Sequence, residues 1–191
     1  MYWLLYVPFV CTVVVAGGLA RFFEQHVPVH KYLTIFPVVC VNVFGIMPLV
    51  HILLDHSGLL IYTGGTGFGV LPALVLADGF VHVMHSMFHN RYLYRWFHYL
   101  HHQYRDPIGL DAFYLHGIDF LMTHCLPFYG AILLVDQHVW TLQLWTCGIT
   151  AAGILLSHAG WGSNFHLVHH RNYRKNLGLG LVADRLLLTT E

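Results

Sequence analysis

Five long apolar stretches constrain the fold of this chain more than any other feature of its sequence. They are 17 to 22 residues long, and as helices they would measure roughly 25 to 33 Å, close to the hydrocarbon thickness of a membrane. With 57% hydrophobic and 9% charged residues, the chain has too little polar surface for a water-soluble globule. Inside lipid the backbone must satisfy its own hydrogen bonds, so each stretch is predicted to be a transmembrane helix. The stretches are residues 4–20, 33–54, 68–84, 118–135 and 139–158.

The basic residues are confined to alternate connecting segments of this predicted bundle. All nine lysines and arginines lie in residues 21–32, 85–117 and 159–191. Since positive charge is retained on the cytosolic side of a membrane, the N-terminus is predicted outside and the C-terminus in the cytosol. The formal net charge of zero gives no reason to expect nucleic-acid binding.

The histidine content is unusually high, because the chain has 17 histidines and only 18 residues of Asp, Glu, Lys and Arg together. Most of those on the predicted cytosolic side follow helical spacing, because residues three and four apart share one face of a helix. One H-x-x-x-H motif and two H-x-x-H-H motifs therefore each present two or three imidazoles to one point. These motifs are His85 and His89, then His98, His101 and His102, and finally His166, His169 and His170.

So many imidazoles exceed the ligand demand of one ion and indicate two metals. The only glutamates are Glu24 and Glu191, so a carboxylate-bridged helical site or an H-E-x-x-H peptidase site cannot be assembled. Neutral imidazole suits iron, zinc, copper or nickel, and ligand type does not choose among them. The predicted ligands are the eight histidines of the three motifs and, as a ninth, His158. No catalytic residue beyond these ligands can be named.

Three aspartates and one further histidine are candidates for supporting this site from outside. We expect them to orient histidine N–H groups and to offset the positive charge of the metals. Roles at helix ends or in loops are the alternative, and His116 is equally consistent with a solvated loop residue. The four candidates are Asp78, His116, Asp119 and Asp184. His82 and His124 are expected to be hydrogen-bonded inside the bundle rather than to line a substrate tunnel.

The order of these motifs is also informative. Asp78 precedes His85 by seven positions, the two H-x-x-H-H motifs follow, and the chain closes on an N-Y pair and an Asp-Arg-Leu run at Asp184. In this order, residues 78–189 resemble the fatty acid hydroxylase superfamily, which includes sterol desaturases, C-4 methyl sterol oxidases and lipid hydroxylases. The sequence departs from the family pattern at Ser86, Gly117 and Ala183, where the family usually has Arg, Pro and Trp.

The resemblance implies an all-α, polytopic integral membrane bundle with a cytosolic, histidine-rich, metal-binding helical cap. Residues 1–67 would form N-terminal transmembrane helices, and residues 68–191 the catalytic region. It also implies an O₂-dependent oxidoreductase with two iron ions, for which zinc can substitute, that hydroxylates or desaturates a lipid C–H bond. The lipid would be a sterol or a long-chain acyl group, and the stretch 107–119 favours the sterol branch.

Electrons would come from external NAD(P)H through a reductase and a b-type cytochrome, and in a eukaryote the membrane would be the endoplasmic reticulum. The residues leave other functions open. A membrane zinc hydrolase, a haem-binding or proton-coupled transport protein, and a catalytically inactive hydroxylase-like scaffold are the alternatives.

Overall fold

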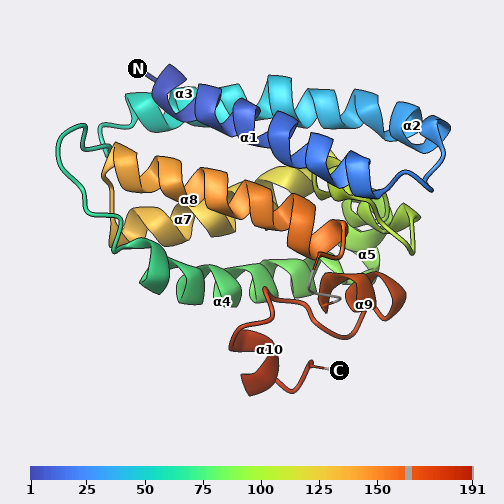
Figure 1. The fold of residues 1–191 in the computed structure, drawn as a ribbon. Helices are drawn as coiled ribbons and strands as arrows, with labels where there is room; N and C mark the ends of the chain where they lie inside the picture. Colours follow the sequence, from blue (N-terminus) through green and yellow to red (C-terminus); the bar gives the residue numbers. More distant parts are fainter. Residues whose placement is uncertain (162–164, 191) are drawn as a thin grey trace.

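The chain folds as an elongated bundle of helical spans whose long axes run side by side (Figure 1). The structure is a computed structural model that describes residues 1–161 and 165–190. In this part of the chain, five helices are long and apolar enough to cross a membrane. They are Trp3–Phe23, Val29–His56, Val70–Phe88, Gly117–Val135 and Val139–His158. Their lengths of 19 to 28 residues confirm the predicted all-helical membrane bundle, although each of the first three extends beyond its predicted stretch.

Three of the five spans change helical pitch along their length. The first span is α1 (Trp3–Phe23) and the third is α4 (Val70–Phe88). The second consists of α2 (Val29–Cys40), the π-helical segment η1 (Val41–Ile46) and α3 (Met47–His56). The fourth consists of α6 (Gly117–Asp119), the π-helical segment η5 (Phe120–Cys125) and α7 (Leu126–Val135). The fifth consists of α8 (Val139–Ala152) and the π-helical segment η6 (Gly153–His158).

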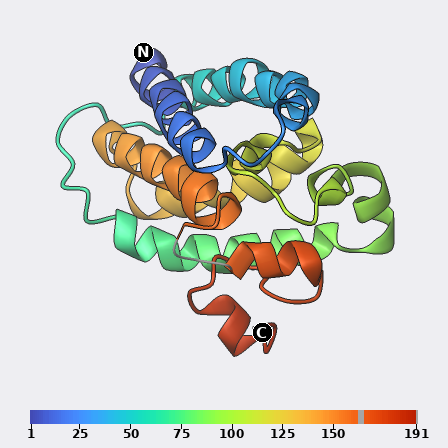
Figure 2. The same cartoon turned by 45° about the vertical axis from the view of Figure 1, so that its right-hand side comes forward.

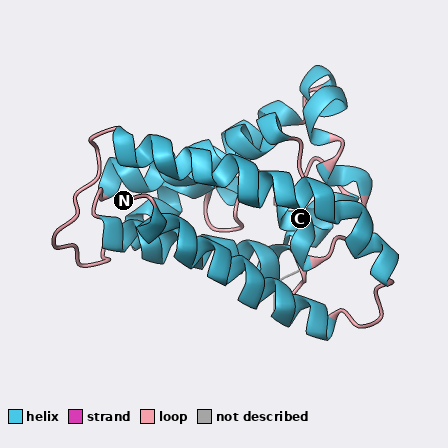
Figure 3. Ribbon diagram, turned by 90° about the horizontal axis from the view of Figure 1, so that it is seen from above, coloured by secondary structure: helices cyan, strands magenta, loops and turns pink. Residues whose placement is uncertain are grey.

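The spans form layers, with α1 and the α2–α3 helix on one side, α7 and α8 in the middle, and α4 on the other side (Figure 1). Viewed from above, the described residues contain helices and loops and no strand (Figure 3). The largest fully buried side chains of the interior include Trp145, Phe9 and Phe120. Helix α1 packs along α8, and α4 along α7, so spans from both halves of the chain share one core. The division of the chain after residue 67 stays a prediction.

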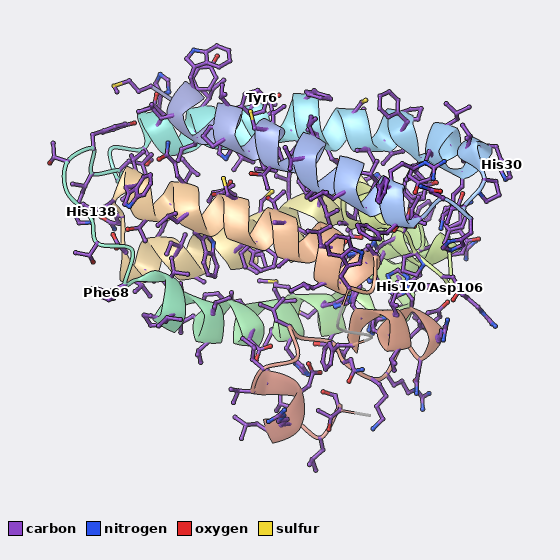
Figure 4. All side chains as sticks on the ribbon, viewed as in Figure 1. Tyr6, His30, Phe68, Asp106, His138 and His170 are labelled. Carbon is purple, nitrogen blue, oxygen red and sulfur yellow. The ribbon has the colours of Figure 1, made fainter. Side chains whose placement is uncertain are left out.

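Short helices gather at one end of the bundle and beside α4, and they form a cap, defined here as residues 89–116, 159–161 and 165–190. In Figure 4, His170 and Asp106 lie at the cap end, and Phe68 and His138 lie at the opposite end. Turning the molecule brings the cap forward and shows α9 lying along the last turns of α4 (Figure 2). The cap helices are α5 (Arg91–Leu93), η2 (Tyr94–His98), η3 (His101–Gln103), η4 (Gly109–Phe113), α9 (Phe165–Arg171) and α10 (Ala183–Leu186).

Polar side chains from the turn after α1 and from the first turn of α2 hold the cap in place. The Glu24 carboxylate accepts a hydrogen bond from the Gly109 N–H at 2.8 Å. The Lys31 Nζ lies 3.2 Å from an Asp111 carboxylate oxygen, and Asp111 is only 1% exposed. Because a buried carboxylate needs such partners, these contacts fix the position of the η4 segment against the bundle.

Close backbone approach and a buried amide complete this attachment. A Cβ added to Gly109 would lie 2.6 Å from the Cβ of Ala20, so only glycine allows η4 to pack this close to α1. The fully buried Asn42 donates hydrogen bonds from Nδ2 to the carbonyl oxygens of Phe113 and Leu115, at 2.9 and 2.8 Å. The loop after η4 is therefore anchored to a membrane span.

Candidate metal centre

Nine buried or half-buried histidines gather at the cap end, and they are the nine that the sequence singles out as ligands. Within each of two groups, one ligand nitrogen from every member lies within 4.8 Å of all the others. The five-histidine group consists of His85, His89, His98, His102 and His169. The four-histidine group consists of His101, His158, His166 and His170.

Separate elements bring these rings to one place. Helix α4 ends on the first motif, and the π-helical segments η2 and η6 each end on a histidine. Helix α9 carries the last motif and packs against η6. Successive residues of a 3₁₀-helix point about 120° apart, so the adjacent His101 and His102 of η3 face different groups.

In the five-histidine group the Nε2 atoms converge. His85 Nε2 lies 3.0 Å from His98 Nε2, and His102 Nε2 lies 3.1 Å from His98 Nε2. His169 Nε2 lies 3.0 Å from His89 Nε2 and 3.2 Å from His102 Nε2. Two nitrogens that each bind one ion at about 2.1 Å and at right angles are about 3.0 Å apart. The spacing therefore fits a shared cation.

The opposite ring nitrogens point outward and are anchored to acceptors. The Nδ1 atoms of His85, His98 and His169 lie 2.9, 2.8 and 2.7 Å from the Leu177 carbonyl, the Asp119 carboxylate and the Lys175 carbonyl, respectively. A carbonyl or carboxylate oxygen can only accept, so in each neutral ring Nδ1 carries the proton and Nε2 presents a lone pair.

This tautomer assignment leaves lone pairs facing one another. His85 Nε2 and His98 Nε2 are 3.0 Å apart, and neither carries a proton to share with the other. Two such acceptors in contact repel, and the repulsion is strong in a buried site that excludes water. A cation between them would turn the repulsion into coordination, which makes this group suited to a metal ion.

The four-histidine group has the same design. His166 Nε2 lies 3.3 Å from His101 Nε2 and 3.2 Å from His170 Nε2. The Nδ1 atoms of His158 and His170 face the carbonyl oxygens of Gly153 and Tyr104, at 2.8 and 3.1 Å. His158 Nε2 is buried and has no hydrogen-bond partner among the described residues. A metal ion would satisfy this orphaned nitrogen.

Burial keeps the cap histidines neutral. Loss of solvent, followed in size by repulsion from neighbouring rings, lowers the pKa of His169 to about 3 and that of His170 to about 2. The same two causes hold the pKa values of His98, His101 and His166 well below 6.5. Neutral rings are the form that binds a metal, so these residues are available as ligands throughout the physiological pH range.

The residues predicted to support the site differ in whether they contact the nine histidines. Asp119 contacts a ring directly, with its carboxylate 2.8 Å from His98 Nδ1, as expected for an orienting carboxylate. The prediction is wrong for His116. Its ring is exposed and caps α6 by accepting a hydrogen bond from the Ile118 N–H at 3.2 Å, and it contacts Phe97 rather than the nine histidines.

Neither Asp78 nor Asp184 is hydrogen-bonded to any of the nine histidines among the described residues, so the expectation that they orient these rings directly is wrong. That they offset the charge of the metals stays a prediction. The Asp78 carboxylate accepts hydrogen bonds from the N–H groups of Leu179, Val182 and Ala183, each at 2.7 Å. Asp184 accepts from the N–H of Leu177 at 2.7 Å. These bonds shape the C-terminal loop, whose Leu177 carbonyl orients His85. Glu191 lies outside the described residues.

The two remaining bundle histidines differ in position. His82 is bonded inside the fold, with Nε2 3.1 Å from the Thr189 hydroxyl. His124 is also bonded, to Thr123, but it lines an apolar cavity of about 360 Å³ that reaches the histidine groups. The expected hydrogen bond of His124 is therefore formed, and its ring also lines this cavity.

Several functional groups carry no signal that sequence reasoning could use. The carbonyls of Leu177, Lys175, Tyr104 and Gly153 orient four rings, yet every residue has a carbonyl. Tyr173, whose ring lies 4.6 Å from that of His102, is marked in the sequence only as part of the closing N-Y pair.

The chain is similar to known proteins of one family. A family model described as fatty acid hydroxylase matches residues 70–189. Methylsterol monooxygenase 1 of Rattus norvegicus is 27% identical over 120 residues, which cover 56% of this chain and 40% of that protein. Very-long-chain aldehyde decarbonylase GL1-11 of Oryza sativa subsp. indica is 30% identical over 116 residues, which cover 53% of this chain and 43% of that protein.

A third relative carries the family name itself. Fatty acid hydroxylase domain-containing protein 2 of Homo sapiens is 26% identical over 108 residues, which cover 53% of this chain and 32% of that protein. The chain thus spans less than half the length of these curated relatives. No solved structure matches the chain.

Proposed function

Because the chain belongs to the fatty acid hydroxylase family, whose model matches residues 70–189, we propose that it is an O₂-dependent membrane oxidoreductase that hydroxylates or desaturates a lipid C–H bond. The observation that carries the proposal is the pair of histidine groups, in which inward Nε2 lone pairs face one another at 3.0 Å. Relatives named as a sterol monooxygenase and an aldehyde decarbonylase support oxidative chemistry on lipids.

Each histidine group would hold one iron ion, the first with five imidazoles and the second with four. When bound, the two irons would supply the chemistry that reduces O₂ and oxidises an unactivated C–H bond. The donor set consists of neutral nitrogens, which suit iron or zinc, and the family favours iron. The groups lie close together, since the rings of His102 and His170 are 4.6 Å apart.

The protein's own contribution is to position these ligands before any metal arrives. Outward hydrogen bonds from Nδ1 to carbonyl and carboxylate oxygens fix both the tautomer and the orientation of five of the rings. Such outer partners raise ligand basicity and make metal binding stronger. The Tyr173 ring, 38% exposed, contacts His102 edge-to-face, with the ring centres 4.6 Å apart, and so covers part of the five-histidine group.

Access for a lipid is provided by the cavity, which extends from the histidine groups into the bundle. Aromatic and aliphatic side chains form most of its walls, and the rings of His85, His101 and His158 line it as well. An apolar substrate is thereby kept out of water while it is held beside the ligands.

Electrons would reach this end of the molecule from an external partner. All nine lysines and arginines of the chain lie in segments on the cap side. We assign this side to the cytosol, where a b-type cytochrome reduced from NAD(P)H through a reductase would be the donor. Basic residues on the cytosolic side agree with the charge rule for membrane proteins.

The proposal is tested by untargeted lipid profiling of cells that express the full chain, the variant His169→Ala, or the control His30→Ala. His169 is buried in the five-histidine group, whereas His30 is exposed. The wild type and the control are expected to produce a lipid that has gained one oxygen or lost two hydrogens, and His169→Ala is expected to produce none.

Two results would contradict the oxygenase. If the lipid products are the same in cells with the wild type and with His169→Ala, the chain does not catalyse their formation. That result would favour a catalytically inactive scaffold. If purified protein contains zinc and modifies lipids by hydrolysis without consuming O₂, it is a membrane hydrolase. Both outcomes are read from the same cells by adding metal analysis and an oxygen electrode.

A further inference from the structure

The last part of the described chain carries an apolar surface that the proposed chemistry does not use. We call residues 177–190, which include α10, the C-terminal segment. Its three consecutive leucines at positions 186, 187 and 188 are 75%, 56% and 83% exposed, and Leu181 and Val182 are exposed as well. Exposed apolar side chains concentrated in this way mark a surface that contacts lipid or another protein.

The C-terminal segment docks on the side of α4 and not beyond its end. In Figures 1 and 2, α10 lies beside α4, between the two ends of that helix, and the two helices pack together. Asp78, the ninth of the 19 residues of α4, accepts hydrogen bonds from three N–H groups of the segment, each at 2.7 Å. His82 Nε2, one turn further along α4, lies 3.1 Å from the Thr189 hydroxyl.

The apolar outer surface of α4 continues past the level of this docking site. The exposed side chains of this candidate membrane span are apolar as far as Met87, and the first exposed charged residue beyond it is Arg91. At 1.5 Å per residue, Met87 lies roughly 14 Å further toward the cap than Asp78 and roughly 8 Å further than His82. The segment is therefore attached to a part of α4 whose outer surface suits the hydrocarbon of a membrane.

Buried carboxylates, and not water, satisfy much of the irregular backbone of the segment. Asp184 accepts hydrogen bonds from the N–H groups of Leu177 and Gly178, at 2.7 and 2.8 Å, and its carbonyl accepts one from the Thr189 N–H at 2.9 Å. Asp78 and Asp184 are 0% and 1% exposed. Non-helical backbone is tolerated at membrane depth only when protein groups pair it in this way.

The residue that ends α10 gives a second sign of an apolar environment. Leu188 has a φ of +56° and occupies the left-handed position after the helix, where glycine or asparagine is usual. In water, neither this backbone conformation nor the exposure of the side chain favours leucine. Lipid around the segment would give the Leu188 side chain a favourable environment.

We infer that the C-terminal segment lies in the cap-side leaflet of the membrane, with the leucines at positions 186, 187 and 188 in contact with lipid acyl chains. Lipid is the occupant of this surface because the segment is docked on a membrane span and adjoins the apolar outer surface of that span. The exposed Arg185 beside the leucines has a side chain long enough to extend toward the phosphate headgroups. The inference concerns the attachment of the chain to the membrane and does not depend on the proposed chemistry.

The test is electron paramagnetic resonance of the spin-labelled full chain in phosphatidylcholine nanodiscs. Alanine replaces the native cysteines other than the buried Cys125, and one nitroxide is attached through Leu187→Cys or Leu188→Cys. Collisions of the nitroxide are measured with O₂, which concentrates in hydrocarbon, and with a nickel chelate, which stays in water. The lipid reference is Val83→Cys on the outer surface of α4, and the water reference is Asp106→Cys, at a position 78% exposed in the cap.

At positions 187 and 188, the ratio of O₂ to nickel collisions is expected to match that at position 83 and to exceed that at position 106 several-fold. Adding Leu187→Asp to the chain labelled at position 188 is expected to lower the ratio toward the water reference, because a carboxylate is expensive in hydrocarbon. Leu187→Ala stays apolar and is the matched control. Slow hydrogen exchange at the Leu179 amide shows that a labelled chain keeps its contact with Asp78.

Three outcomes would overturn the inference. A ratio at positions 187 and 188 nearer to that of position 106 than to that of position 83 would place the segment in water. Few collisions with either probe would show that protein covers the leucines, as in a contact with a second copy of the chain. A ratio that Leu187→Asp leaves unchanged would show that the side chain at position 187 does not lie in hydrocarbon.

Discussion

At the residue scale, the carboxylate of Asp119 connects two parts of the site. One of its oxygens accepts a hydrogen bond from His98 Nδ1, and the other accepts from the Thr123 hydroxyl. The residue is fully buried, so both bonds are formed away from water. An orienting carboxylate of this kind contributes to metal affinity although it does not touch the metal.

Replacing Asp119 by Ala is expected to weaken metal binding about 10- to 100-fold, because the His98 ring loses the acceptor that holds its tautomer. Iron affinity, measured by titration of metal-free protein, checks this. Thr123→Val removes the other hydrogen bond of Asp119 but keeps the contact with His98, so it is expected to retain nearly normal affinity. Equal losses in Asp119→Ala and Thr123→Val would show that general disruption of η5, and not ring orientation, is responsible.

Spacing in the sequence was sufficient to find the nine histidines but not to divide them. His98, His101 and His102 form one motif, yet the structure places His101 in a different group from the other two. The division depends on the direction in which each side chain leaves η2 and η3, and on the arrival of α9 from about 65 residues further along the chain. Neither is encoded in local spacing, and the orienting backbone carbonyls leave no trace in residue identity.

At the element scale, the cap depends on contacts with the first turn of α2. The pair of Lys31 and Asp111 is mostly buried, with exposures of 12% and 1%. Burial raises the pKa of Asp111, and the charge of Lys31 opposes this shift. The carboxylate thus depends on its partner to remain ionised inside the protein.

Lys31→Met is expected to destabilise the protein by about 3–5 kcal/mol, since it leaves a buried carboxylate without its cation. Thermal unfolding in detergent measures the change, and adding Asp111→Asn to the variant is expected to recover part of it. Asp106→Asn is the matched control, because the pair of Asp106 and Arg171 is 78% and 64% exposed and such pairs contribute little. An unfolding temperature unchanged by Lys31→Met would contradict this description of the cap.

The C-terminal loop is held by Asp78 of α4, which accepts three backbone hydrogen bonds from it. Asp78→Ala is expected to speed hydrogen exchange at Leu179, Val182 and Ala183 and to lower iron affinity, because the loop also carries the carbonyl that orients His85. Exchange measured by mass spectrometry tests this, with Ser86→Ala on the same helix as control. Unchanged exchange at these amides would show that Asp78 does not order the loop.

The spans were predictable from length and hydropathy because lipid leaves the backbone no alternative to helix. The ends of the spans were harder to predict. Helix α4 continues four residues past the predicted end at residue 84, and this extension carries His85 toward the cap. The packing of the cap was not predictable either. It depends on single contacts across long separations, such as Glu24 with Gly109 and Asn42 with Leu115.

At the scale of the whole molecule, the five candidate spans of the described residues would place the two ends of this chain on opposite sides of the membrane. The N-terminus lies at the end of the bundle away from the cap, and the C-terminus lies beside the cap (Figure 1). With all nine lysines and arginines on the cap side, that side is expected to face the cytosol. The metal groups would then lie where a cytosolic donor can reach them.

Epitope tags on the two ends test this orientation in intact cells. After selective permeabilisation of the plasma membrane, the C-terminal tag is expected to bind antibody, while the N-terminal tag becomes accessible only after all membranes are opened. Cells with either tag also serve as a control for folding if they retain the lipid product. Accessibility of both tags from the cytosol would contradict a five-span arrangement.

The iron content of the purified full chain, after anaerobic reconstitution and removal of loosely bound metal, tests the two-metal centre most directly. Two irons per chain are predicted for wild type and for the exposed control His26→Ala. One is predicted for His158→Ala, in which only the four-histidine group is damaged, and one for His169→Ala, in which only the five-histidine group is damaged. Iron that stays at or below one per chain in wild type, or that is unaffected by both substitutions, would contradict it.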